Sequence, residues 1–203
     1  MHEPIATDQA GWAVARSELI LGGQKSGKSR RAELLALAWL ARSPAHSAVL
    51  IATAQPWDEE MRERIARHQQ DRAERVPSLR TVEEPVQLAQ MLARHSQPQT
   101  LVVVDCLTLW LTNLLMPAEN FEENKAFAHT ARAQDAIVLI AIKEAAGPVV
   151  LVGNEIGLGV IPLGHETRAF VDALGRLNQE VAQVCERVTF MAAGLPLTLK
   201  GRP

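Results

Sequence analysis

Short apolar runs alternate with longer segments of helical periodicity along most of this chain. Six apolar runs predict strands, at residues 18–21, 48–52, 101–104, 149–152, 188–192 and 197–200. Helical periodicity fills the intervals between the first four runs, near residues 28–42, 57–75, 85–95 and 106–146. This alternation is typical of βαβ units, so it predicts an α/β fold with a mostly parallel sheet and helices on both faces.

The ends of the chain and one internal segment depart from this alternation. The last two runs are separated only by Ala-Gly-Leu-Pro, so we expect them to form an antiparallel hairpin at one edge. Polarity rises over residues 117–130, where we expect a connection between two helices. Residues 1–16 lack the apolar stretch of a signal peptide. We expect them to be a flexible extension of a single domain, residues 17–203.

The composition of the chain argues against nucleic acid and a membrane span as partners. The 203 residues are 47% hydrophobic and 22% charged, with a net charge of -2. This balance gives no broad basic surface for nucleic acid, so any anion site must be local. The apolar stretches are interrupted well short of the roughly 20 residues that span a membrane. Cys106 and Cys185 lack metal-binding spacing and follow no secretory signal, which favours a cytoplasmic location.

A glycine-rich loop in LILGGQKSGKSRR, residues 19–31, follows the first predicted strand and precedes a helical segment. Its Gly22-x-x-x-x-Gly27-Lys28-Ser29 spacing matches a phosphate-binding loop (P-loop), whose backbone N–H groups surround nucleotide phosphates. Lys28 would reach the β- and γ-phosphates, and the Ser29 hydroxyl would bind Mg²⁺. Within the predicted architecture, the loop indicates a RecA-like P-loop NTPase fold. An ordinary glycine-rich turn is the alternative.

Other polar residues stand near predicted strand ends. Asp105 ends the strand at 101–104, as a second magnesium-holding carboxylate does in P-loop proteins, although it could also be a helix N-cap. The loop at 153–164, GNEIGLGVIPLG, follows the carboxyl end of a strand, where ligands bind in open α/β sheets. We expect it to contribute a substrate site. The residues proposed for that site are Asn154, Glu155, Gly157 and Gly159.

The residue pattern does not decide the roles of three further groups of charged or titratable residues. His68 shares one face of a predicted helix with Met61, Ile65 and Arg72, and it could be a hydrogen-bonded, partly buried histidine or a covalent nucleophile. Arg30 and Arg31 would oppose the dipole of the helix after the loop, which suggests that at least one serves an anionic ligand. Arg80 and Glu83 follow a possible short strand and alone fit solvated charges.

An ordered series of motifs extends along almost the whole chain. It consists of GGQKSGKS, IATAQ, DEEMRERIARHQQDR, RTVEEP, VDCLTLWLTNLL, VGNEIGLGVIP with RAFVDALGRLNQEVA, and AGLPLTLK. The P-loop alone identifies only a very large class, whereas NEIGLG followed by LGRLNQ is far more specific. The series resembles the bifunctional adenosylcobinamide kinase / adenosylcobinamide-phosphate guanylyltransferase family of cobalamin biosynthesis.

The resemblance implies two reactions on one chain. A nucleoside triphosphate, ATP or GTP, phosphorylates adenosylcobinamide. GTP then gives GMP to a histidine, which passes it to adenosylcobinamide phosphate and forms adenosylcobinamide-GDP, with pyrophosphate released. The family's R-I-x-x-H-x-x-x-R pattern falls on Arg64, Ile65, His68 and Arg72, which makes His68 the nucleophile. The nucleotide contacts implied by the family are Gly22, Gly23, Gln24, Lys25, Ser26, Gly27, Lys28, Ser29, Thr53, Ala54, Gln55, Gln69, Arg72, Glu83 and Asp105.

The resemblance also implies a homo-oligomer, typically a trimer. Two positions of this chain depart from the family pattern, and two other functions remain as hypotheses. Leu79 stands where the family commonly has tryptophan, and Lys25 stands where it commonly has arginine, which loses a bidentate fork. A P-loop kinase of another small alcohol, with a structural His68, is a second hypothesis. A RecA-like ATPase or switch module is a third.

Overall fold

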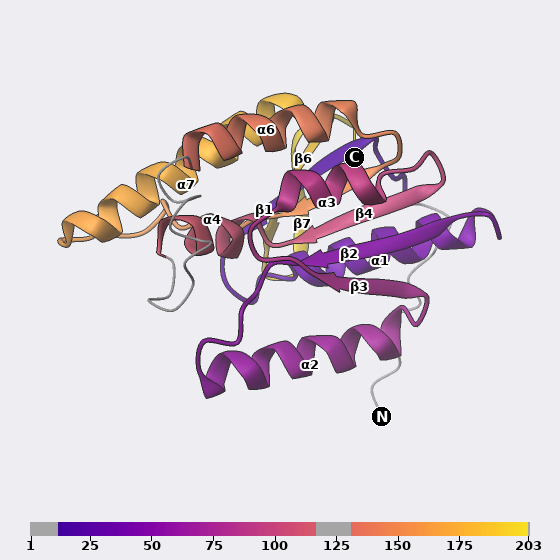
Figure 1. The fold of residues 1–203 in the computed structure, drawn as a ribbon, viewed down its shortest axis with the longest axis horizontal. Coiled ribbons are helices and arrows are strands. Elements are labelled where there is room, and N and C mark those ends of the chain that lie inside the picture. Colours follow the sequence, from indigo (N-terminus) through magenta and orange to yellow (C-terminus); the bar gives the residue numbers. More distant parts are fainter. Residues whose placement is uncertain (1–11, 117–130, 203) are drawn as a thin grey trace.

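The computed structural model describes residues 12–116 and 131–202, and their centre is a seven-stranded sheet with the order β3-β2-β4-β5-β1-β6-β7 (Figure 1). Neighbouring strands are parallel except β6 and β7, which pair antiparallel. The predicted parallel sheet with a C-terminal hairpin is therefore confirmed. The strands are β1 (Ser17–Gly22), β2 (Ser47–Ala52), β3 (Leu79–Glu83), β4 (Thr100–Asp105), β5 (Val149–Val152), β6 (Arg187–Ala192) and β7 (Leu195–Lys200).

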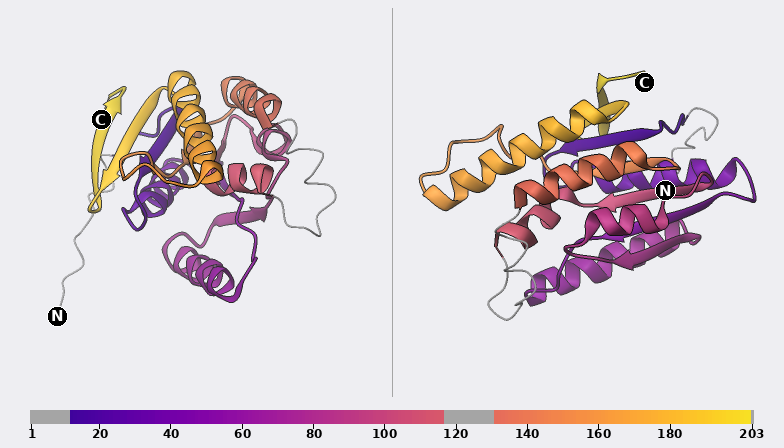
Figure 2. Two further views of the ribbon diagram at one scale, coloured as in Figure 1. Left: turned by 90° about the vertical axis from the view of Figure 1, so that its left-hand side faces the viewer. Right: turned by 45° about the horizontal axis from the view of Figure 1, so that its top comes forward.

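Helices cover both faces of the sheet, as the alternating pattern predicted. The helices α3, α4, α6 and α7 pack on one face of the sheet and α1 packs on the other, and Figure 1 shows α2 below β3. The two turned views show α2 standing apart from the other helices (Figure 2). The helices are α1 (Lys28–Ala41), α2 (Glu59–Arg75), α3 (Leu88–His95), α4 (Leu107–Leu115), α6 (Ala131–Glu144) and α7 (His165–Val184). No helix of this described part is long and apolar enough to cross a membrane.

Two apolar clusters form the core, one on each face of the sheet. Leu19 and Leu21 of β1 belong to the cluster beneath α3, α4, α6 and α7, whereas Ile20 between them belongs to the cluster beneath α1. Successive strand side chains point to opposite faces, so a strand buried on both sides must be apolar throughout. This explains why the central strands were recognisable in the sequence.

The strand β3 departs from the prediction, which did not include it among the six apolar runs. Arg80 and Glu83 were expected to follow a short strand, but they lie within β3. Of its five residues only Leu79 is buried, because β3 is at the edge of the sheet. A half-exposed edge strand carries too few apolar residues to be found by hydrophobicity alone.

The segment predicted as helical over 106–146 contains α4 and α6. The connection expected at 117–130 lies outside the described residues. Residues 12–16, part of the expected N-terminal extension, contact the rest of the domain. The Trp12 ring lies 5.2 Å from the Arg31 guanidinium carbon, and the Arg16 backbone N–H donates to the Glu186 carboxylate.

Candidate active site

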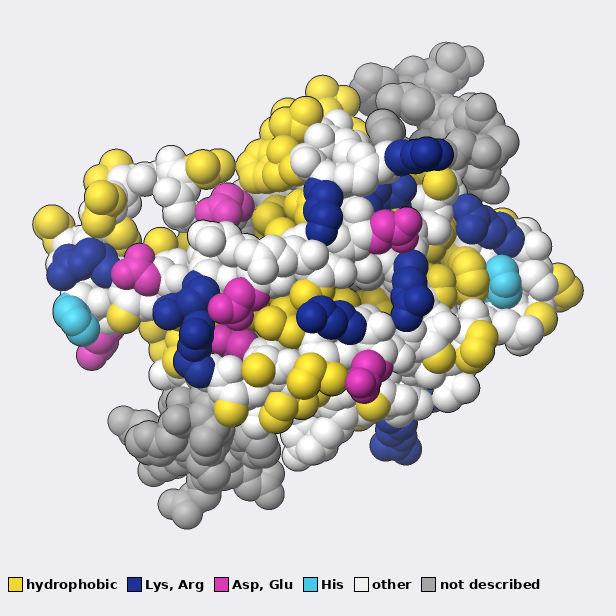
Figure 3. All heavy atoms as spheres, turned by 90° about the horizontal axis from the view of Figure 1, so that it is seen from above, with side chains coloured by type: hydrophobic (Ala, Val, Ile, Leu, Met, Phe, Trp, Pro, Cys, Tyr) yellow, Lys and Arg dark blue, Asp and Glu magenta, His cyan; other side chains and the backbone are white. Residues whose placement is uncertain are grey.

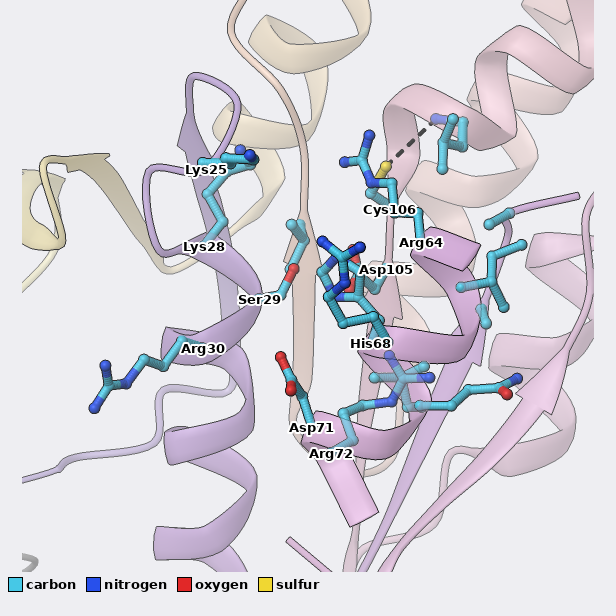
Figure 4. A pocket seen from close by; sticks show the side chains of 18 of the residues that line it. Lys25, Lys28, Ser29, Arg30, Arg64, His68, Asp71, Arg72, Asp105 and Cys106 are labelled. Atoms are coloured by element: carbon cyan, nitrogen blue, oxygen red, sulfur yellow. Dashed lines mark hydrogen bonds between the residues drawn. The ribbon is translucent and has the colours of Figure 1, made fainter. Parts of the chain in front are cut away.

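A cavity of about 570 Å³ lies where the loop after β1 and the carboxyl end of β4 meet the inner face of α2 (Figure 4). Its volume falls in the range of small-molecule sites. The structure brings together most residues that the sequence singled out, although they come from six separate segments. Those lining the cavity are Gln24, Lys25, Ser26, Gly27, Lys28, Ser29, Ala54, His68, Gln69, Arg72, Glu83, Asp105 and Asn154.

The loop between β1 and α1 adopts the tight turn with positive φ angles that its glycines predicted. Gly27 is the N-cap of α1 with φ 99°, a left-handed conformation that glycine adopts without steric cost. A Cβ on Gly22 would lie 2.4 Å from the Met191 carbonyl oxygen, so no other residue fits there without movement. The loop and the first residues of α1 line the cavity, and the free N–H groups at the start of a helix are the donors of an anion site.

Two distant segments hold this loop in place. The Gly194 N–H, in the turn between β6 and β7, donates to the Ser26 carbonyl at 3.0 Å. The Glu155 N–H, after β5, donates to the Gly22 carbonyl at 3.1 Å. These bonds fix both ends of the loop, so the phosphate-binding geometry depends on residues more than a hundred positions away.

Lys28 is buried at the start of α1, and its ammonium lies over the loop. Its Nζ donates to the Gly23 carbonyl at 2.6 Å and lies 3.5 Å from the Ser26 hydroxyl. Burial lowers the pKa of Lys28, while Cys106 and Asp105 act in the opposite direction. A desolvated ammonium among backbone donors interacts strongly with an anion, because the local dielectric is low.

Asp105 ends β4, which is separated from β1 by β5 alone. Its side chain and that of Ser29 face the same cavity (Figure 4). The alternative role of Asp105 as a helix N-cap is wrong, because Cys106 is the N-cap of α4 and its Sγ accepts from the Leu109 N–H.

Thr53 is fully buried behind the cavity rather than lining it. Its hydroxyl donates to the Cys106 carbonyl at 2.7 Å and accepts from the Cys106 N–H at 2.8 Å. Asn113 donates to the Thr53 carbonyl at 2.8 Å and to the Pro85 carbonyl at 3.0 Å. These bonds tie the ends of β2 and β4 together, which sets the position of Asp105. Gln55, like Thr53, does not line the cavity.

The helix α2 turns His68 towards the cavity. Met61, Ile65, His68 and Arg72 all line it, so the predicted helix face is confirmed. Burial lowers the pKa of His68, opposed by Asp105, and the positive charges of Arg64 and Arg72 lower it further. The neutral imidazole, the nucleophilic form, is therefore favoured near neutral pH.

One arginine of the site, Arg64, was not among the expected nucleotide contacts. Arg64 lies one helical turn before His68 and lines the cavity, and the i,i+4 spacing from His68 was a signal for it. Arg72 is buried, and its Nε has no hydrogen-bond partner within the described part of the chain. Arg31 instead donates to buried Glu18 at 3.0 Å, whereas Arg30 lines the cavity and extends away from its centre (Figure 4).

The loop at 153–164 meets the cavity only at its start. Asn154 lines the cavity, and its N–H donates to the Thr108 hydroxyl at 2.8 Å. Glu155, Gly157 and Gly159 do not line it, and the Glu155 carboxylate accepts from the Gly157 N–H at 2.7 Å. Beyond them the loop projects outwards with apolar side chains exposed (Figure 3). Those exposed side chains are Ile156, Leu158, Val160, Ile161 and Leu163.

Comparison with known proteins places these features in one family. Residues 18–199 match the model of the family described as cobinamide kinase / cobinamide phosphate guanyltransferase. The chain is 47% identical over 190 residues to the bifunctional adenosylcobalamin biosynthesis protein CobP of Pseudomonas aeruginosa, covering 92% of this chain and 98% of that protein. It is 34% identical over 187 residues to the bifunctional adenosylcobalamin biosynthesis protein CobU of Salmonella typhimurium, covering 90% and 98%.

A solved structure shares the architecture at low sequence identity. The flagellar accessory protein FlaH from Methanocaldococcus jannaschii aligns with a TM-score of 0.51 and 11% identity, covering 96% of this chain and 83% of that one. This likeness concerns the fold alone, and with the loop geometry it confirms the RecA-like P-loop fold. Since the family model spans nearly the whole described domain, this chain belongs to the cobinamide kinase / cobinamide phosphate guanyltransferase family.

Proposed function

We propose that this chain catalyses two successive reactions at one nucleotide site. ATP or GTP phosphorylates the hydroxyl of adenosylcobinamide, and GTP then supplies GMP through His68 to adenosylcobinamide phosphate. The products of the second reaction are adenosylcobinamide-GDP and pyrophosphate. The observation that carries this proposal is the placement of the P-loop and His68 against a single cavity.

In the kinase reaction the substrate hydroxyl attacks the γ-phosphorus, and the nucleoside diphosphate leaves. Catalysis of phosphoryl transfer consists mostly of positioning and charge stabilisation. The loop N–H groups and the Lys28 ammonium would supply both, because they line the cavity that is proposed to hold the triphosphate. The remaining nucleotide contacts of the proposal are the cavity-lining residues Gln69, Glu83 and Ala54.

In the transfer reaction a nitrogen of the His68 imidazole attacks the α-phosphorus of GTP. The nitrogen–phosphorus bond forms as the bond to the pyrophosphate oxygen breaks. A phosphate oxygen of adenosylcobinamide phosphate then attacks the same phosphorus and releases the imidazole. Arg64 and Arg72 lie one turn before and after His68, where their charges offset those of the phosphates.

Mg²⁺ is the proposed cofactor, held by Ser29 and Asp105. A hydroxyl and a carboxylate facing one cavity suit this ion, which binds through few protein oxygens and keeps several waters. When bound, it would neutralise phosphate charge. The Asp105 carboxylate also raises the pKa of both Lys28 and His68, so its charge acts on both groups.

Replacing Asp105 with asparagine is expected to raise the Mg²⁺ concentration needed for half-maximal activity in both reactions by about tenfold or more. The amide keeps the size of the side chain but removes the charge that attracts the cation. Titrating activity against Mg²⁺ measures this shift. The exposed Asp172→Asn variant is the control, and an unchanged Mg²⁺ requirement in Asp105→Asn would remove Asp105 from the metal site.

The two-step function is tested by incubating the purified chain with α-labelled GTP. The proposal expects a covalently labelled chain that loses its label when adenosylcobinamide phosphate is added. A kinase of another small alcohol, or an ATPase that switches a partner, would give no covalent nucleotide. Phosphorylation of adenosylcobinamide is assayed in parallel with γ-labelled ATP and GTP.

We also propose that the loop at 153–164 contributes to binding the corrinoid substrate. Glu155→Ala removes the bond that shapes the turn to Gly157, and a lost hydrogen bond is worth about 0.5–1.5 kcal/mol. The expected result is a KM for adenosylcobinamide raised about threefold to tenfold, with an unchanged KM for nucleotide. Glu166→Ala, exposed in the first turn of α7, is the matched control. Unchanged kinetic constants would make the loop a connector only.

The proposal also includes a homo-oligomeric assembly and a cytoplasmic location. A homo-oligomer, a trimer on the family pattern, is supported by exposed leucines on β7 that a monomer would leave in water. These are Leu195, Leu197 and Leu199. A cytoplasmic location is supported by Cys106 and Cys185, which are both free and buried.

A further inference from the structure

The helix that carries His68 is weakly anchored to the sheet. All seventeen residues of α2 are described, and Arg72 alone among them is buried. An apolar stripe normally fixes a helix of this length on a sheet. The stripe of α2 instead lines the cavity, with Met61 and Ile65 each only partly covered. Other interactions must therefore define how close His68 comes to the P-loop.

One ion-pair cluster joins α2 to the P-loop helix α1. Glu33 lies five residues after Lys28 on α1, and its side chain is 3% exposed. Its carboxylate accepts from Arg75, in the last turn of α2, at 2.5 Å. A second guanidinium nitrogen of Arg75 donates to Asp71, one turn earlier on α2, at 2.8 Å. Arg75 thus bridges the two helices, and its bond to Asp71 fixes the orientation of its side chain.

The position of this cluster links it to the chemistry. The residues Lys28 and Ser29 begin α1, and His68 lies two turns before Arg75 on α2. In Figure 4 the Asp71 carboxylate extends from α2 towards α1, with His68 further along the same helix. A change in the separation of the two helices at Arg75 would therefore move the imidazole relative to the triphosphate loop.

We propose that Glu33 and Arg75 are positioning residues that hold α2 against α1, so that His68 reaches the α-phosphate. This inference rests on the proposed function of His68. The γ-phosphoryl transfer does not use the imidazole, and of α2 it uses only the proposed nucleotide contacts Gln69 and Arg72. At saturating nucleotide the pair should therefore matter much more for GMP transfer than for phosphorylation, a separation that a general loss of stability would not produce.

The kinetic test compares Arg75→Met with the wild-type chain. Methionine keeps much of the apolar stem and removes both ionic bonds. At saturating GTP, the rate of covalent labelling is expected to fall about tenfold or more, because misplaced reacting groups lose rate steeply. Phosphorylation of adenosylcobinamide, measured at saturating nucleotide, should stay within about twofold. Arg75→Lys should recover part of the rate, since it keeps the charge but loses the fork that bridges Glu33 and Asp71.

The control is an ion pair on the same helix that does not bridge to α1. Arg62 donates to Glu59 at 2.7 Å, and both side chains are more than half exposed. Exposed pairs of this kind contribute little, so Arg62→Met should change both rates by less than about twofold. Equal labelling rates in Arg75→Met, Arg62→Met and wild type would overturn the inference.

A distance measurement tests the same inference without using activity. Spin labels on Ala41→Cys of α1 and Ala66→Cys of α2 report the separation of the helices, because both positions are exposed. Burial raises the pKa of Cys106 and Cys185 to about 12 each, so the native thiols react slowly with the label. Arg75→Met and Glu33→Gln should lengthen or broaden the distance distribution, and Arg62→Met should not.

The two measurements separate the possible failures. If the wild-type chain takes no label from α-labelled GTP, the proposed function of His68 fails, and the distances still decide whether the pair positions α2. If wild type is labelled and the distances are unchanged in Arg75→Met and Glu33→Gln, the positioning role is excluded.

Discussion

Replacing Lys28 with alanine is expected to lower both phosphorylation of adenosylcobinamide and GMP transfer by about a hundredfold or more. One ammonium serves the triphosphate in both reactions, because the loop after β1 lines the cavity that His68 also faces. Loss of a preorganised transition-state contact is worth about 2.7–4 kcal/mol, and each 1.36 kcal/mol is about tenfold in rate. Steady-state kinetics of the two half reactions measure the loss.

Lysine at position 143 offers the matched control for this change. It is exposed on α6, away from the cavity, so Lys143→Ala should retain both activities. Near-normal phosphorylation by a folded Lys28→Ala protein would remove the assignment of residues 22–29 as the phosphate-binding loop.

Replacing His68 with alanine is expected to abolish covalent labelling by α-labelled GTP, and with it GMP transfer, while phosphorylation of adenosylcobinamide remains largely intact. The imidazole is the nucleophile of the transfer reaction alone, and once protonated it becomes a good leaving group. Labelling of the wild type should survive mild base and be lost in mild acid, as expected for a phosphoramidate. His165→Ala, at the exposed start of α7, is the control.

The dependence on pH gives His68 a second signature. Burial, Arg64 and Arg72 lower its pKa from the ordinary value of 6.5, so the imidazole stays neutral at pH values where an exposed histidine is protonated. The labelling rate should therefore persist to below pH 6.5 and fall only as the pH drops through the lowered pKa. Undiminished labelling of a folded His68→Ala protein would place the nucleophile elsewhere. The histidines to test next are His2, His46, His95, His129 and His165.

Features encoded by neighbouring residues could be predicted from the sequence by itself. The P-loop is contiguous, since Gly22, Gly27, Lys28 and Ser29 act through one turn and one helix start. The central strands are apolar because helices cover both of their faces. The face shared by His68 and Arg72 follows from the helical period, and the hairpin of β6 and β7 follows from its short turn.

The tertiary structure decided which polar groups meet when they come from distant segments. Thr53 and Asn113 are 60 positions apart, and nothing in their local pattern indicates that Asn113 of α4 donates to the Thr53 carbonyl after β2. Arg31 and Arg75 resemble any other arginine on a helix. One nevertheless pairs with buried Glu18, and the other bridges α2 to Glu33.

The physical reason for this division is the range of the forces involved. Periodicity and glycine conformation act over a few residues, so they remain legible along the chain. The pairing of a buried carboxylate depends instead on which elements pack together and exclude water around it. The folded sheet brings α1, α2 and the end of β4 around one cavity, so Lys28, His68 and Asp105 share the site that only the family resemblance had implied for them.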